Sequence, residues 1–334
     1  MRYIFSFAFV LCAFLAKSQD LHFSLADYSP LTLNAGETGL FDGDWRVTGN
    51  YRQQWKSIGQ PFQTIAAAYD QQIYALPGQF SAGLVVVNDQ SGAIDLINNR
   101  VYLSMAYAHN TPLWTFSAGI QPGFVIKSYN LNGTSFPEQY NDNIGIYDPS
   151  LPLSESNLSN QTNYFDLNAG LAAERKLKSG SIKAGFSVQH LNAPNVSFFD
   201  NKDQLAQRFN SYVKWNHDFK SDVFIRTMVL VSTLQKAQEL VFGGDVGLYV
   251  SDSPNGVKEI SLGMDLRNGF NRNADAYILS LGVVISDFRA ALAYDVNYSN
   301  LNQATNNRGA IEFSLIYISP STAIKHITIP CDRY

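Results

Sequence analysis

Few residues in this sequence have the types and spacing that catalysis or metal binding requires. The chain has five histidines, scattered at His22, His109, His190, His217 and His326. It contains no G-x-S-x-G, H-E-x-x-H, G-x-G-x-x-G or Walker pattern, and no cluster of Cys and His at zinc-ligand spacing. Spacing alone leaves open a nucleophile–base pair assembled across strands. The sequence therefore predicts a protein that is not an enzyme, with no cofactor and no metal site.

Two short stretches contain residue types that can bind metal ions. "YNDNIGIYD" (140–148) has the oxygen-rich composition of a calcium loop but lacks the order D-x-D-x-D-G-x5-E, which favours a solvated loop. In "GFSVQHLNAP" (185–194), His190 comes at the end of an alternating run that Pro194 breaks. This position favours a hydrogen-bonded residue at a strand end over a metal ligand.

The elements that position these residues are expected to be strands, because period-2 alternation recurs and helical periodicity is nearly absent. The pattern predicts about fourteen strands, most of a length that crosses a bilayer when tilted. They are expected at 45–55, 62–71, 79–88, 98–108, 113–127, 163–175, 181–191, 208–219, 222–233, 238–250, 257–268, 276–286, 288–298 and 308–318.

The connections favour an outer-membrane barrel over a secreted β-sandwich or propeller, which alternation alone allows. If the first strand runs outward, the periplasmic connections are short, as in "KLKSG" and "KSD". The opposite connections include the long segments 128–162, 192–207 and 299–307. This asymmetry is typical of an up-and-down antiparallel barrel with periplasmic termini. Tyr and Trp near many strand ends suit the two membrane interfaces.

Composition and the N-terminus agree with export. Charged residues make up 16% of the 334 residues, aromatic residues 13%, and the formal charge of −4 does not indicate a nucleic-acid partner. Residues 1–18 are interpreted as a signal peptide that leaves Gln19 first, and a retained anchor is the alternative. The predicted organisation is a periplasmic segment 19–44, a transmembrane barrel 45–318 and a periplasmic tail 319–334. Cys331 is then the single cysteine of the exported chain.

The predicted lumen is wide and carries charges of both signs. A barrel of about fourteen strands is too wide for its wall side chains to fill, so it must hold water, a plug, a folded loop or a ligand. Loop 128–162 is a candidate lumen cover or binding surface. The lumen positions argue against a simple ion-selective pore. They are Arg46, Arg52, Lys183, Arg208, Lys214, Arg267, Arg289, Asp166, Glu174, Asp218, Glu259, Asp265, Asp295 and Glu312.

Several motifs together resemble one family. The sequence contains "RVTGNYRQQWKSIGQPFQT" (46–64), "GLVVVNDQSG" (83–92), "AGIQPGFVIKSYN" (118–130), "GFSVQHLNAPN" (185–195) and "GAIEFSLIY" (309–317). In this order, the motifs N-Y-R-x-Q-W, N-D-x-x-G and H-L-N-x-P are similar to those of the PorP/SprF family of the Bacteroidetes type IX secretion and gliding motility machinery. The chain departs from the family pattern at "NAGETG" (34–39), which lacks a proline, and at Cys331-Asp332.

The resemblance implies an outer-membrane barrel that supports secretion or surface attachment of a partner protein, such as a secreted adhesin, by binding its C-terminal sorting domain. It also implies contacts with other proteins of the type IX machinery and brings no catalytic residues. The motif positions supply the candidate residues. Those for partner binding are His190, Asn192, Pro194, Asn88 and Asp89, and those with a structural role are Tyr51, Arg52, Trp55, Gly92 and Glu312.

The main alternative is an outer-membrane transporter for a hydrophobic or small solute. Such a transporter calls for an apolar lumen pocket, whereas the predicted lumen positions are polar and glycine-rich. The sequence also shows no plug domain before the first strand beyond the segment 19–44. Both features favour the partner-binding hypothesis.

Overall fold

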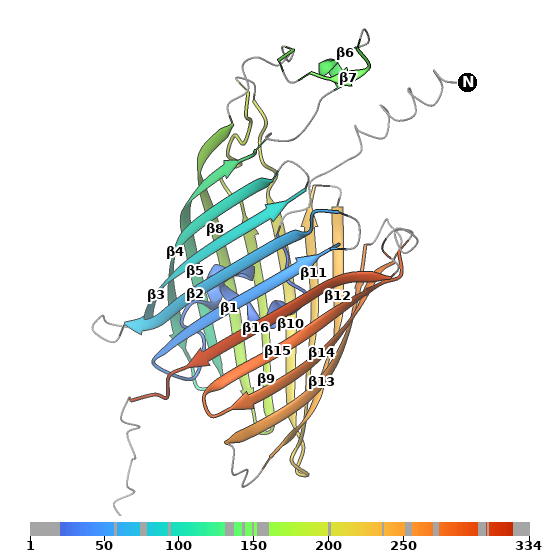
Figure 1. Ribbon diagram of the computed structural model, residues 1–334. Helices are drawn as coiled ribbons and strands as arrows, with labels where there is room; N and C mark the ends of the chain where they lie inside the picture. The colour runs from blue at the N-terminus through green and yellow to red at the C-terminus, as the bar shows by residue number, and fades with distance from the viewer. Residues whose placement is uncertain are drawn as a thin grey trace, which may run out of the picture.

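The computed structural model describes the greater part of the chain from residue 21 onward. The described residues are 21–56, 59–73, 79–92, 95–130, 137–141, 144–148, 150–151, 160–199, 202–235, 237–250, 256–269, 274–299, 305 and 307–322. The predicted signal peptide, Cys331 and most of the predicted tail therefore lie outside the described residues. Within them, the dominant feature is a closed antiparallel β-barrel (Figure 1).

The barrel confirms the predicted fold and nearly all of the predicted strand positions. Each strand pairs with its sequence neighbours in the barrel, and β1 pairs with β16 to close it. The fourteen barrel strands are β1 (Trp45–Gln54), β2 (Phe62–Ile73), β3 (Gln79–Ser91), β4 (Leu96–Asn110), β5 (Trp114–Ser128), β8 (Gln161–Leu177), β9 (Gly180–Gln189), β10 (Arg208–Asp218), β11 (Val223–Leu234), β12 (Ala237–Tyr249), β13 (Val257–Asn268), β14 (Ala274–Ile285), β15 (Phe288–Asn297) and β16 (Arg308–Ile318).

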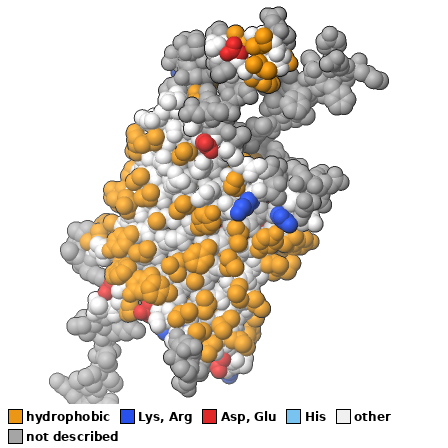
Figure 2. All heavy atoms as spheres, in the orientation of Figure 1, with side chains coloured by type: hydrophobic (Ala, Val, Ile, Leu, Met, Phe, Trp, Pro, Cys, Tyr) orange, Lys and Arg blue, Asp and Glu red, His pale blue; other side chains and the backbone are white. Residues whose placement is uncertain are grey.

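Side chains alternate between the lumen and the outer wall, as the sequence predicts. On β13, Ile260, Leu262 and Met264 face outward and are 46%, 68% and 51% exposed. Figure 2 shows apolar side chains spread over the outer wall, with few charged ones on this face. Exposed apolar side chains of this density indicate that lipid, not water, surrounds the wall. The structure is thus that of an outer-membrane barrel.

The two ends of the barrel differ in their connections. At one end, here called the short-turn end, β1 begins, β16 ends, and Lys178 and Ser179 alone join β8 to β9. Aromatic rings gather there: the centroids of Trp45 and Tyr317 are 5.0 Å apart. At the opposite, long-connection end, residues 129–160 carry a 3₁₀ turn η3 (Pro137–Gln139) and a small hairpin of β6 (Tyr140–Asn141) and β7 (Ile146–Tyr147). The sequence analysis did not predict this hairpin.

The N-terminal segment lies inside the barrel, whereas the sequence predicted a separate periplasmic segment at residues 19–44. Residues 21–44, called the plug from here on, form η1 (Ala26–Tyr28), α2 (Pro30–Leu33) and η2 (Ala35–Glu37) behind β1 and β2 in Figure 1. The predicted separate segment 19–44 therefore differs from the structure, because its described residues are buried against the lumen wall. In the described residues, no helix is long and apolar enough to cross a membrane.

Candidate functional site: the plug and its lumen wall

The plug is held near its start by carboxylates on the wall. Glu312 on β16 accepts the backbone N–H groups of Ser24 at 2.7 Å and Leu25 at 3.0 Å. The Ser24 hydroxyl donates to Asp295 on β15 at 2.8 Å. These bonds satisfy buried backbone N–H groups that would otherwise have no hydrogen-bond acceptor. They fix where the plug begins in the lumen.

Two arginines neutralise these carboxylates. Arg52 on β1 lies 2.9 Å from Asp295 and 3.2 Å from Glu312. Arg267 on β13 lies 2.8 Å from Asp295, and both residues are almost completely buried. Removing one member of such a buried cluster leaves an uncompensated charge in the interior. The first half of the plug therefore rests on an ion-pair network contributed by β1, β13, β15 and β16.

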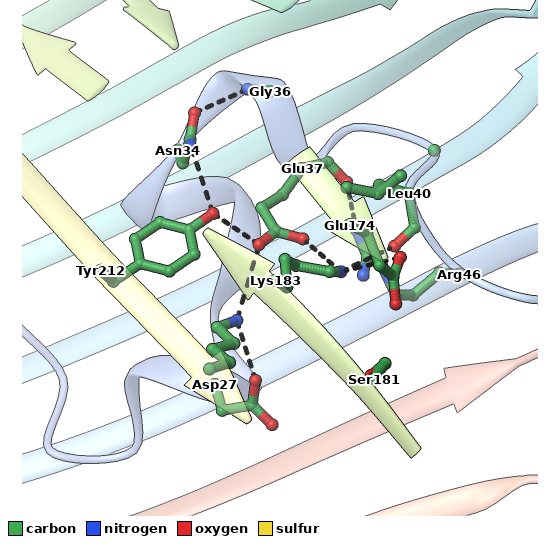
Figure 3. Close-up of polar contacts among 12 residues, drawn as sticks. Asp27, Asn34, Gly36, Glu37, Leu40, Arg46, Glu174, Ser181, Lys183 and Tyr212 are labelled. Atoms are coloured by element: carbon green, nitrogen blue, oxygen red, sulfur yellow. Dashed lines mark hydrogen bonds and ion pairs between the residues drawn. The ribbon is translucent and has the colours of Figure 1, made fainter. Parts of the chain in front are cut away.

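A second polar network holds the other half of the plug (Figure 3). The buried Glu37 carboxylate accepts the Tyr212 hydroxyl at 2.5 Å and lies 3.1 Å from the Lys183 ammonium. Lys214 bridges two acidic groups of the plug, lying 2.8 Å from Asp27 and 3.6 Å from Glu37. Wall cations of β9 and β10 thus face acidic side chains of the plug.

Two wall glycines bring the plug into direct contact with the backbone of the sheet. A Cβ at Gly119 on β5 would lie 2.2 Å from the Ala35 carbonyl oxygen, and one at Gly170 on β8 would lie 1.8 Å from Asn34 Oδ1. Asn34 in turn donates to the Leu171 carbonyl at 2.8 Å. Larger residues at these two positions would displace η2, so the glycines define its docking surface.

Polar wall side chains also cap the carbonyl groups of the short helix α2. Gln121 donates to the Leu31 carbonyl at 2.9 Å, and Ser187 donates to the Leu33 carbonyl at 2.7 Å. A four-residue helix cannot satisfy its own C-terminal carbonyls. The lumen wall therefore supplies the hydrogen bonds that allow so short a helix to persist.

Apolar contacts complete the interface between plug and wall. Phe23 and Leu31 belong to one buried cluster, Leu25 and Tyr28 to a second, and Leu33 to a third. Burial of each large side chain contributes roughly 1.5–3 kcal/mol. A cavity of about 70 Å³ remains beside Asp27, lined in part by Lys214, Arg226 and Arg289. Apolar side chains such as Leu25, Met228 and Val241 line the same cavity, so its lining is mixed.

Among the predicted candidate residues, the structure brings Arg52 and Glu312 together in the ion-pair network. Tyr51, which directly precedes Arg52, faces outward from the barrel and is half-buried. Trp55 follows β1 with a φ of 58° and packs edge-on against Phe62, with ring centroids 5.1 Å apart. Gly92 has a φ of 74° in the turn after β3, a conformation that favours glycine. All five belong to the barrel framework or its turns.

His190 and its neighbours shape the exit from β9. His190 is 2% exposed, has a φ of 58°, and its Nδ1 lies 2.8 Å from the Asp166 carboxylate. The structure thus confirms the hydrogen-bonded interpretation of this histidine. Asn192 donates to the Phe165 carbonyl at 2.8 Å and continues the pairing with β8, and the buried Pro194 accepts from the Leu205 N–H at 2.9 Å.

Asn88 and Asp89 also have partners within the wall. Asn88 donates to Asn99 on β4 at 2.7 Å, and Asp89 accepts from Thr64 on β2 at 2.7 Å. The partner-binding role of these residues, like that of His190, Asn192 and Pro194, stays a prediction. The described part of the chain holds no group of three or more His, Cys, Asp or Glu side chains that could bind a metal.

The plug residues, above all Asp27 and Glu37, are not among the candidates that the sequence predicts. The available signal was modest: residues 23–40 combine apolar side chains with Pro30, Asn34 and Gly36 and carry no basic residue. Such a stretch has no helical or strand period of its own. Its structure depends on partners that lie far away in the sequence.

The comparisons with known proteins agree with the geometry. The sequence profile of a family described as type IX secretion system membrane protein PorP/SprF matches residues 15–317. No curated protein matches the chain.

Solved structures with a similar fold come from other bacteria. The Ralstonia pickettii toluene transporter TbuX is 11% identical with a TM-score of 0.51, over 86% of this chain and 92% of that one. The Pseudomonas putida toluene transporter TodX is 10% identical with a TM-score of 0.46, over 90% and 94%. At this identity, the likeness to TbuX shows a shared fold and carries no information on ligands.

Proposed function

The chain belongs to the PorP/SprF family of type IX secretion system membrane proteins, and on this premise we propose that it anchors a partner protein at the outer membrane. The family and the barrel together make it an outer-membrane component of type IX secretion. The proposed role is to support secretion or surface attachment of a secreted protein, such as an adhesin, by binding its C-terminal domain. Contacts with other proteins of the secretion machinery accompany this role.

The observation that carries the proposal is the occupied lumen. The plug is joined to the wall by buried hydrogen bonds from Ser24 to Glu312 and Asp295 and by the ion pair of Glu37 with Lys183. A folded or extended polypeptide has no passage through a lumen filled in this way. The partner is therefore expected to bind a surface of the barrel and not to thread through it.

The surface at the long-connection end suits this role better than the opposite end. Connections there are longer, since β5 and β8 are separated by residues 129–160 and β9 and β10 by residues 190–207. Long loops on a rigid barrel are where outer-membrane proteins place binding residues. With the predicted orientation, this end faces the cell exterior, where an attached protein would be displayed.

The transporter alternative receives less support from the site. The fold is shared with TbuX, whose description is a toluene transporter. The cavity beside the plug is about 70 Å³, well below the roughly 300–1,000 Å³ of a typical ligand pocket. Asp27, Lys214, Arg226 and Arg289 also stand among its apolar lining residues. Ion-pairing groups at these positions make the cavity unfavourable for a hydrocarbon.

The test is a gentle detergent extraction of the native tagged protein, followed by mass spectrometry of the proteins that accompany it. Recovery of a large secreted protein or its C-terminal domain supports the anchoring role. Recovery of periplasmic and lipoprotein components alone indicates a structural part of the machinery. A barrel that is isolated alone with a small molecule in its lumen would overturn the proposal in favour of transport.

A further inference from the structure

The hairpin of β6 and β7 exposes apolar side chains outside the barrel wall. Tyr140, Ile144, Ile146 and Tyr147 are 43%, 59%, 59% and 51% exposed. Most other large exposed apolar side chains lie on the outer wall, where lipid covers them. The hairpin lies beyond the ends of the barrel strands in Figure 1. Apolar groups left in water at such a place are typical of an interaction surface.

Backbone hydrogen bonds and one contact between aromatic rings define the hairpin. Tyr140 pairs with Tyr147 across the two strands, and their ring centroids are 5.2 Å apart. Gly145, with a φ of 71°, donates to the Asn141 carbonyl at 2.8 Å and closes the turn. The Asp148 N–H donates to the Gln139 carbonyl at 2.8 Å. These bonds fix the backbone that carries the exposed side chains.

The edges of this two-stranded sheet are suited to pairing. Within the described part of the chain, β6 and β7 form a sheet of their own and join no barrel strand. A short sheet outside the barrel can accept an additional strand from another protein. Backbone hydrogen bonds then supply affinity, and side chains beside the added strand supply selectivity.

The loop that carries the hairpin is acidic. Residues 129–160 contain no Lys or Arg, and the next basic residue after Lys127 is Arg175. The acidic residues of the loop are Glu138, Asp142, Asp148 and Glu155. Hydrogen bonds from the side chain and backbone of Ser150 lower the pKa of the Asp148 carboxyl. The hairpin therefore presents apolar groups next to fixed negative charge.

We propose that the β6–β7 hairpin is the docking surface for an extended, positively charged segment of the partner's C-terminal domain. This inference rests on the proposed function and assigns it a place on the chain. Apolar side chains of the segment pack on Ile146 and Tyr147, and its Lys or Arg side chains lie near Asp148. The complementary charges would also speed encounter at low salt.

Two synthetic peptides test the surface on the full-length protein in detergent micelles. One alternates Lys with Val and Tyr, and the other has Glu in place of every Lys. We expect the Lys peptide to bind at least about tenfold more tightly than the Glu peptide, a difference that fluorescence anisotropy resolves. Ile146→Asp should weaken binding of the Lys peptide by a similar factor, and Asp148→Lys should reverse the preference.

A matched control is available in the neighbouring loop. Phe199, between β9 and β10, is 44% exposed, so Phe199→Asp makes the same kind of change on a different surface. This variant should leave peptide binding unchanged. Equal affinity for the two peptides, or equal binding by wild type and Ile146→Asp, would overturn the inference. Heat-modifiable migration on gels verifies that each variant retains its barrel.

A parallel measurement with the partner's C-terminal domain separates this inference from the proposed function. If wild type and Ile146→Asp capture the domain equally, the hairpin is not the docking surface and the anchoring role stands. If neither captures the domain, the anchoring role itself fails. Capture of the domain by wild type, together with loss of capture in Ile146→Asp, supports both the docking surface and the anchoring role.

Discussion

The Glu312 carboxylate on the last barrel strand accepts the backbone N–H of Ser24 at 2.7 Å, although 288 residues separate the two in sequence. Glu312 also lies 3.2 Å from Arg52. One side chain thus joins the plug, the first strand and the last strand. Docking of the plug is coupled in this way to closure of the barrel.

Replacing this carboxylate should loosen the plug. In Glu312→Gln the amide oxygen still accepts one hydrogen bond, but the second N–H loses its acceptor and Arg52 keeps only Asp295 as a charged partner. We expect docking to weaken by about 1–3 kcal/mol. Faster hydrogen exchange of residues 21–44 in the folded protein measures this effect. Glu259→Gln, which removes the charge of the acidic group nearest to Arg226, at 2.6 Å, is the control. Equal hydrogen exchange of residues 21–44 in both variants would count against the coupling.

Asp295 should matter more, because two buried arginines depend on it. Asp295→Asn leaves Arg52 and Arg267 with reduced compensation, and breaking buried pairs of this kind typically costs about 3–5 kcal/mol. We expect a lower unfolding midpoint in urea. The exposed pair of Lys176 and Asp42, 2.8 Å apart, provides the comparison, since Asp42→Asn should leave the midpoint unchanged. A similar midpoint for both variants would show that the network contributes little.

A single methyl group at the glycine contact should displace the plug. The Cβ of Gly119→Ala would lie 2.2 Å from the Ala35 carbonyl oxygen, whereas a Cβ at Gly49 meets no atom within 4 Å. We therefore expect Gly119→Ala to raise ion conductance in planar bilayers above that of wild type, and Gly49→Ala to leave it unchanged. Wild-type conductance in both variants, together with wild-type rates of hydrogen exchange at residues 34–37, would contradict the proposed packing.

The lipid-facing wall makes a separate prediction. Leu262 on β13 is 68% exposed and points outward. Near the membrane midplane, Leu262→Arg should destabilise the barrel by about 2–4 kcal/mol, because lipid cannot solvate the charge. Refolding into vesicles followed by urea titration measures the loss. Ile146→Arg on the hairpin introduces the same charge outside the wall and should not change barrel stability.

The barrel could be predicted from the sequence because each strand carries its own signal. The alternation of Ile260, Leu262 and Met264 with polar residues is local, so it does not depend on the sequences of the neighbouring strands. The predicted strand ends two residues beyond the observed end of β9, because His190 adopts a positive φ and leaves the hydrogen-bonded ladder. Element boundaries of this kind depend on a single backbone conformation that composition does not reveal.

The plug could not be predicted in the same way. Its helical turns are three or four residues long, too short to show a period. The groups that stabilise it, such as Lys183 for Glu37, come from strands more than a hundred residues away. Arg52 and Glu312 were singled out as motif residues, but their shared partner Ser24 emerged only when the barrel brought them together.

The central claim is that the barrel holds its partner while its lumen stays closed, and a locked plug tests it most directly. The hydroxyl oxygens of Thr38 and Ser104 are 2.6 Å apart, so cysteines at these positions are placed to form a disulfide between plug and wall. In a Cys331→Ser background, we predict that cells with the oxidised Thr38→Cys, Ser104→Cys protein display the partner protein at wild-type levels. Loss of display that a reductant restores would contradict the account, because the plug would then have to leave the lumen.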